Sequence, residues 1–369
     1  MFLLPSTTHG SLQLQPPTFS KTICPIVFNP VTSSTFYGEQ ALDIKNIHSA
    51  SYSDPTGSLK KTTYITKIGI YDDDKNYLVF LYRDNYKSIE ELSNKELRLA
   101  GLRINPKTNI GSRVNYYNNM RIKNFDTNLD EPSSIKGMLT NMKISNLNWS
   151  PDQTKIAFTN TTELGVDLWI LDLKTSSAKK VFDLKLNSNI GSVINWFSDS
   201  KNMLVKVIPS NKQDIIEAGG IVPSGPTISS NSGEKAQNRT YQDLLKNTTD
   251  EFNFEQLVNS ELYQVSEDGS YSKWLKKGMY TSISISPDGN YVMISKIKKP
   301  FSYLVTYRRF PTSINIYSKN SELVSNLIDI PLIEELPKGF MAVREGKRSF
   351  SWRMDKPSSM IYAEALDSG

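Results

Sequence analysis

One short motif recurs along the chain and constrains its fold more than any other feature. Each copy has an aromatic or aliphatic residue, two intervening residues and an aspartate, and a short apolar, β-forming run follows. The aspartates are Asp74, Asp152, Asp199, Asp288 and Asp355, and three copies begin with the tryptophans Trp149, Trp196 and Trp352. Because aspartate favours tight turns, the motif predicts a series of similar β-sheet units.

The distances between the aspartates suggest how these units are arranged. Successive aspartates lie 78, 47, 89 and 67 residues apart, and a four-stranded propeller blade takes about 40–45 residues. We interpret the steps as two blades, one blade, two blades, and one blade with an insertion. The prediction is an all-β fold, an incomplete β-propeller of about six or seven WD-like blades with four antiparallel strands each. A β-sandwich would explain the alternating strands but not the recurring motif.

The predicted propeller occupies residues 61–369. In it the tryptophans of the motif wedge between blades and the aspartates hold turns, so both are expected to be structural. A stretch rich in Gly, Pro and Ser at 209–240 predicts a long irregular loop. Short helices, expected at 88–97 and 241–246, would interrupt the sheets as insertions.

The first 60 residues differ in composition from the rest of the chain. Residues 1–38 contain no acidic residue and are rich in Ser, Thr and Pro. This composition favours a disordered or atypical leader, or a non-native extension. It also resembles, more distantly, an organellar transit peptide, although those usually carry arginine.

Residues for catalysis or metal binding are scarce. The only histidines are His9 and His48, and Cys24 is the only cysteine. No nucleophile elbow, phosphate-binding loop or zinc motif is present, and the acidic triplet at 72–74 is interpreted as a solvated turn. We therefore expect no catalytic residue, no metal site and no cofactor in this chain.

The distribution of charge and hydropathy bears on the partners. The net charge is +5, with no concentrated basic stripe, so nucleic acid is not expected. No window approaches the ~18 apolar residues of a membrane span, so no membrane partner is expected either.

Two adjacent arginines, Arg308 and Arg309, follow an apolar aromatic run. If they lie in a strand, they point to opposite faces of the sheet. An inward arginine could hold a substrate carboxylate, because its planar fork binds both oxygens. An internal salt bridge with one of the many carboxylates is the favoured alternative.

Seven segments together resemble one known family. They lie in order along residues 65–369 and include a Trp-Ser-Pro-Asp turn and an Arg-Phe-Pro triplet. The segments are 95–104, 149–152, 222–226, 239–245, 300–303, 309–311 and 352–358. The set resembles the N-terminal, non-catalytic portion of prolyl oligopeptidase family serine peptidases, especially the glutamyl endopeptidases of chloroplasts and their bacterial relatives.

This resemblance implies a propeller that caps an α/β-hydrolase domain and restricts access to its serine site. The catalytic Ser, Asp and His of the family belong to that later domain, so none is assigned here and the chain alone is expected to be inactive. Arg239 and Arg309 lie in matching segments, and we hypothesise that they face the glutamate carboxylate of the substrate. Family precedents suggest a bacterial periplasm or a plastid, although no clear signal peptide is present.

Two other functions remain open. A free-standing propeller could bind a peptide or protein, and a sugar-active propeller enzyme would need a pair of catalytic carboxylates. The expected partners are a peptide or protein substrate and the missing hydrolase domain. An incomplete propeller also leaves an unpaired sheet edge, so we expect the isolated chain to be marginally stable or to form homo-oligomers.

Overall fold

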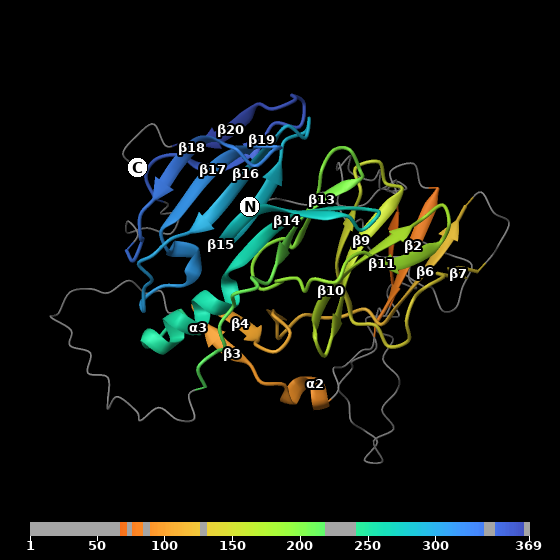
Figure 1. The fold of residues 1–369 in the computed structure, drawn as a ribbon, viewed down its shortest axis with the longest axis horizontal. Helices are drawn as coiled ribbons and strands as arrows, with labels where there is room; N and C mark the ends of the chain where they lie inside the picture. The colour runs from red at the N-terminus through yellow and green to blue at the C-terminus, as the bar shows by residue number, and fades with distance from the viewer. Residues whose placement is uncertain are drawn as a thin grey trace, which may run out of the picture.

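Antiparallel strands dominate the protein in the computed structural model, which describes residues 67–71, 76–83, 89–125, 131–217, 241–335 and 344–364. Figure 1 shows sheets fanned side by side around a common centre. The all-β propeller class is thereby confirmed. Within the described ranges, no helix is long and apolar enough to cross a membrane.

The first two sheets are separate four-stranded units, here called blades 1 and 2. Blade 1 orders its strands β1-β2-β6-β7 and blade 2 is a simple meander, β8-β9-β10-β11. Their bounds are β1 (Lys67–Tyr71), β2 (Tyr77–Tyr82), β6 (Asn119–Asn124), β7 (Ser133–Ser134), β8 (Ile144–Trp149), β9 (Lys155–Thr162), β10 (Gly165–Asp172) and β11 (Ser177–Lys180).

The next sheet has seven strands, because one long strand serves two blades. The first half of β15 pairs with β14 and completes blade 3, and its second half pairs with β16 and begins blade 4. The strands are β12 (Ile194–Trp196), β13 (Asn202–Val207), β14 (Ser260–Ser266), β15 (Tyr271–Ile285), β16 (Tyr291–Ile297), β17 (Thr312–Ser318) and β18 (Leu323–Ile330). A hairpin of β19 (Arg348–Trp352) and β20 (Met360–Ala363) follows as the start of blade 5.

The blade count per aspartate step differs from the expectation. The 78-residue step ending at Asp152 and the 89-residue step ending at Asp288 each contain one blade, not two. The extra residues form insertions between the second and third strands of blades 1 and 3. The total of six or seven blades in a complete propeller stays a prediction.

Strand β10 explains why the strands read as unbroken apolar runs. Val166, Leu168 and Ile170 belong to the core between blades 2 and 3. The alternate residues Trp169 and Leu171 belong to the core between blades 1 and 2. Because side chains alternate along a strand, a sheet packed on both faces needs apolar residues at every position. Further hydrophobic cores lie between blades 3 and 4 and between blades 4 and 5.

The insertions carry the two short helices, one within its predicted range and one later in the chain than predicted. The predicted helix at 88–97 is shorter, α2 (Ile89–Ser93), and the strand β3 (Leu97–Leu99) already begins at its end. Residues 241–246 are not helical, and α3 (Thr248–Val258) follows them. Asn247 caps α3 by accepting the amide of Asp250 at 2.9 Å. The leader at 1–60 and most of the predicted loop, 218–240, lie outside the described residues.

Candidate functional site

The insertions all leave the sheets at the same end. In a four-stranded antiparallel blade, the second-to-third connection lies opposite the other two connections. This connection carries α2 and β3 to β5 in blade 1, α3 in blade 3, and the 3-10 helix η3 (Tyr307–Arg309) in blade 4. Figure 1 shows α2, α3, β3 and β4 together below the sheets. We call these connections the insertion layer.

The insertion layer has a hydrophobic core of its own. This core joins residues from three blades to Ile190, just before β12, and to Met279, where the half of β15 that pairs with β16 begins. Its aromatic centre is a triangle of Phe254, Phe301 and Phe310, with ring centroids 5.2, 5.7 and 5.3 Å apart. Phe254 comes from the blade 3 insertion and the other two rings come from the blade 4 insertion, so the layer packs as one unit on the end of the propeller.

A tight hairpin from blade 1 is clasped between the other two insertions. It joins β3 to β4 (Leu102–Asn105) through Ala100 and Gly101, which both have positive φ. Gly101 donates its amide to the carbonyl of Asp243 at 2.8 Å, and Tyr307 donates to the carbonyl of Ala100 at 2.9 Å. A Cβ on Gly101 would lie 2.7 Å from Cγ2 of Thr306, so the clasp requires glycine there.

Ion pairs reinforce the same contact. Arg103 Nε lies 2.6 Å from Oδ2 of Asp243, and both side chains are largely buried. Arg103 also lies 3.6 Å from Glu96, which accepts hydrogen bonds from Arg98 and Ser112. Burial alone would raise the pKa of Glu96, but the bonds from Ser112 and Arg98 and the charge of Arg103 outweigh it and lower that pKa. Glu96 therefore stays ionised among the arginines.

Arg309, proposed as a substrate-facing residue, lies in η3 within this layer. The adjacent arginines are therefore not in a strand, and the expectation of opposite sheet faces is wrong. The Arg309 guanidinium lies 5.1 Å from the ring centroid of Tyr241. Its Nη1 is buried and has no hydrogen-bond partner within the described residues. Arg239, the second proposed residue, lies outside the described residues, two positions before Tyr241.

A buried lysine beneath the layer was not anticipated from the sequence. Lys206 is 2% exposed, and its Nζ donates to the carbonyl of Ile190 at the start of the inner strand region. Burial lowers its pKa to about 7. The signal in the sequence was a single lysine inside the apolar strand β13, since lysines are rarely buried.

Four aspartates of the recurring motif lie at the opposite end of the blades, in the first turn of each: Asp152, Asp199, Asp288 and Asp355. The fifth, Asp74, lies outside the described residues. Asp152 accepts the hydroxyl of Ser150 at 2.6 Å and the amide of Thr154 at 3.1 Å. Asp199 and Asp288 accept backbone amides in the same way, at 2.9 and 3.1 Å. Asp355 instead pairs with Arg353. These local bonds support the proposed structural role.

The motif tryptophans lie between blades. Trp196 donates Nε1 to the carbonyl of Asn148, and Trp352 donates to the carbonyl of Ser284. Trp149 packs on the core between blades 1 and 2. These contacts fit the proposed wedging role. Across the described ranges, no three His, Cys, Asp or Glu side chains are grouped for metal binding.

Comparison with curated proteins finds two plant relatives. The chain is 33% identical over 311 residues to the protein named probable glutamyl endopeptidase, chloroplastic, of Oryza sativa subsp. japonica. It is 32% identical over 310 residues to the protein of the same name from Arabidopsis thaliana. Each match covers 81% of this chain and about a third of the relative. The chain thus spans about one third of the length of these relatives.

Solved structures show weaker likeness. Pyrococcus horikoshii acylaminoacyl peptidase aligns with a TM-score of 0.34 and 16% identity, over 70% of this chain and 31% of that one. Prolyl oligopeptidase B from Galerina marginata aligns with a TM-score of 0.36 and 9% identity, over 78% and 29%.

No family model matches the chain. The assignment rests on the two plant relatives and on the ordered motif segments. On that evidence the chain is a relative of the proteins named glutamyl endopeptidase and matches about a third of their length.

Proposed function

We propose that this chain is the substrate-gating propeller of a serine endopeptidase that cleaves after glutamate, and that it is inactive without a hydrolase domain. The observation that carries the proposal is the insertion layer, in which connections from blades 1, 3 and 4 share one core at one end of the propeller. A layer of this kind restricts which substrates reach a catalytic domain placed beyond it.

The position of the layer supports gating. Ile190 and Met279 join its core, and they lie where the chain enters the inner strands of blades 3 and 4. The layer therefore covers the ends of the strands nearest the propeller centre. The clasp at Gly101 and the Arg103–Asp243 pair hold it closed.

Arg309 supports the preference for glutamate. Its Nη1 is buried without a partner in the described part of the chain, while the guanidinium face stacks near Tyr241. A buried donor without a partner costs about 1–3 kcal/mol, and a substrate carboxylate would satisfy it. This argument rests on chemistry and position, since the remaining contacts of a substrate would come from other parts of the enzyme.

The specificity test uses an enzyme in which this propeller is joined to an α/β-hydrolase domain. We expect Arg309→Met to lower kcat/KM for a Glu substrate by tenfold or more, roughly 1.4 kcal/mol, with little change for a Gln substrate. Arg308→Met, at the exposed neighbouring position, is the matched control. Equal loss on both substrates, or no loss, would overturn the specificity role.

The gating test uses substrate size. Asp243→Asn weakens the pair with Arg103, so we expect faster cleavage of long polypeptides relative to a short Glu peptide. An unchanged ratio would argue against gating. The isolated chain should cleave neither substrate, and any serine-dependent cleavage by it would contradict the proposal.

A further inference from the structure

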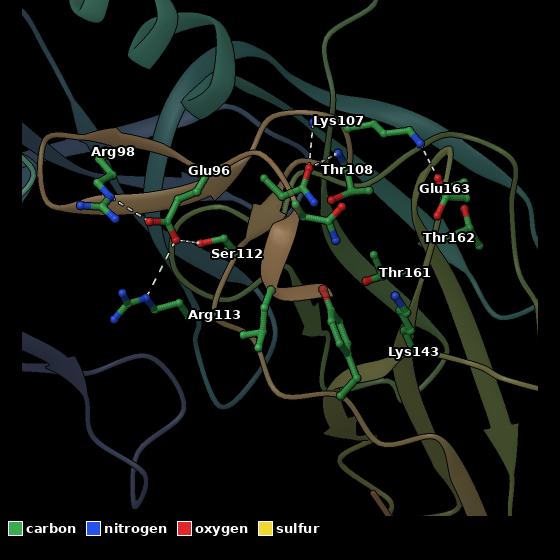
Figure 2. A pocket seen from close by; sticks show the side chains of 15 residues that line it. Glu96, Arg98, Lys107, Thr108, Ser112, Arg113, Lys143, Thr161, Thr162 and Glu163 are labelled. Carbon is green, nitrogen blue, oxygen red and sulfur yellow. Dashed lines mark hydrogen bonds and ion pairs between the residues drawn. The ribbon is translucent and has the colours of Figure 1, made fainter. Parts of the chain in front are cut away.

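We propose that a cleft beside the insertion layer binds the carboxylate side chains of an acidic peptide segment. The inference rests on the proposed function, because it describes a second contact for a glutamate-containing substrate. The cleft lies between the blade 1 insertion, from α2 to β5 (Ile110–Gly111), and the β9–β10 hairpin of blade 2. Its volume is about 400 Å³, and Figure 2 shows the side chains around it.

The charges around the cleft favour an anion. Four cationic side chains line it, Arg98, Lys107, Arg113 and Lys143, against two carboxylates, Glu96 and Glu163. Lys107 pairs with Glu163 at one side of the cleft. On the other side Glu96 has the lining residues Arg98 at 2.9 Å and Arg113 at 3.9 Å. Outside the lining, Arg103 lies 3.6 Å from Glu96, and Asp243 lies 3.9 Å from Arg98. The lining therefore keeps an excess of positive charge after its internal pairs are made.

Two buried hydroxyl groups add an independent indication of a ligand. Thr108 and Thr161 line the cleft and are only 7% and 8% exposed. The Oγ1 atom of each is buried and has no hydrogen-bond partner within the described structure. Figure 2 shows Thr108 beside the Lys107–Glu163 pair and Thr161 beside Lys143. Since buried polar groups are nearly always paired, these hydroxyls are suited to donate to a bound acceptor.

The combination identifies the class of ligand. A carboxylate accepts hydrogen bonds from hydroxyls and binds the arginine fork with both oxygens. Single-stranded nucleic acid, the other anionic polymer, needs a continuous basic groove with several stacking rings. This lining includes one aromatic residue, Tyr116, and two acidic ones. A short peptide with glutamates therefore fits the cleft better.

The test measures binding of a fluorescent peptide of alternating Glu and Gly to the full chain by anisotropy. A Gln–Gly peptide of equal length is the control ligand. We expect the Glu peptide to bind at least roughly tenfold more tightly at low salt, and the difference to shrink as salt rises. Equal binding of the two peptides would overturn the proposal, as would displacement of the Glu peptide by oligo-dT at equal concentration.

Two variants locate the binding site. Arg113→Gln removes an exposed cation, and Thr161→Val removes the unpartnered hydroxyl without a change of shape or loss of an internal hydrogen bond. Each should weaken binding of the Glu peptide by roughly five- to tenfold. Arg353→Gln, in the turn between β19 and β20, is the control and should bind like the wild type. Wild-type affinity in both cleft variants, with unchanged melting temperature, would contradict the inference.

The outcomes separate this inference from the proposed function. Cleavage after Glu with no binding at the cleft rejects the cleft alone. Binding at the cleft with no cleavage after Glu in the joined enzyme rejects the proposed function alone.

Discussion

Trp196 donates its indole Nε1–H to the carbonyl oxygen of Asn148 at 3.1 Å and so joins the inner strands of blades 2 and 3. In turn the side-chain amide of Asn148 donates a hydrogen bond to the carbonyl of Ile194 at 2.9 Å. Trp352 makes the same bond to Ser284, between blades 4 and 5, at 3.0 Å. Asn148 and Ser284 each lie four residues before the turn aspartate of their blade. Trp196 and Trp352 thus join blades 2 to 3 and blades 4 to 5 by the same contact.

Where blade 3 meets blade 4, the repeated contact is absent and another connection takes its place. The motif position is occupied by Ile285, which has no side-chain donor. Here the two blades share one continuous strand, because β15 passes from one to the other without a break. An indole bridge is therefore dispensable at this junction.

Removing the indole donor should destabilise the protein. Trp196→Phe leaves the Asn148 carbonyl without this bond, so we expect the free energy of unfolding to fall by about 1–3 kcal/mol beyond the loss of buried area. Trp169→Phe is the matched control, because the buried Nε1 of Trp169 has no partner in the described structure. Urea unfolding of both variants checks this, and equal losses would show that the bond contributes nothing.

Lys206 should make stability depend on pH. Its pKa is about 7 in the folded protein and about 10.4 in an unfolded chain. Between these values the unfolded state binds more protons, so stability rises with pH from about 7 to 10. Lys206→Met should reduce this slope, leaving the part due to the partly buried Lys212 and Lys296, and should stabilise the protein at or below pH 7 by an amount on the order of a few kcal/mol. Urea midpoints from pH 6 to 10 test this.

The matched control for that experiment is Lys201→Met, at an exposed position just before the same strand. It should preserve the pH slope of the wild type. An undiminished slope in Lys206→Met would show that Lys206 does not produce the pH dependence.

The turn aspartates should produce a pH dependence of the same sign, but in the acidic range. Burial alone would raise the pKa of Asp152, but the bonds from Ser150 and Thr154 outweigh it and lower that pKa below 3.8. The ionised form therefore stabilises the fold above about pH 4, and this contribution is lost as pH falls through the folded pKa. Asp152→Asn should cost up to about 1 kcal/mol at pH 7, since the side chain is exposed to solvent.

The check is chemical denaturation at pH 7 and pH 3. The gap between Asp152→Asn and the wild type should narrow at the lower pH. Glu131→Gln, at another exposed carboxylate, should show little change at either pH. A gap that stays constant would mean that charge does not matter in this turn.

The clasp of the insertion layer should depend on Gly101. Gly101→Ala brings a Cβ against Thr306 and places alanine at φ of 86°, so we expect a loss of about 1–2 kcal/mol. Hydrogen exchange should increase in the β3–β4 hairpin and in α3, but not in blade 2. Adding Thr306→Gly should recover part of the loss by removing the clash. No recovery would place the cost in the backbone conformation alone.

The sequence was sufficient for features whose bonds are local. The turn at Asp152 is closed by hydrogen bonds with Ser150 and Thr154, so five consecutive residues are enough to predict it. The apolar run of β10 likewise follows from its own residues, because both faces of that strand are buried. Local turns and apolar strands recurring at intervals were enough to predict an all-β propeller, and the motif segments indicated its family.

Only the tertiary structure decided how many residues each blade takes and what the insertions do. Spacing cannot distinguish two blades from one blade with an insertion, and helix signals at 241–246 preceded the real helix by several residues. Arg309 acquires its surroundings from Tyr241, and Lys206 from Ile190 and the layer above it. These contacts join residues distant in the chain, and their energies depend on burial that arises only when three insertions pack together.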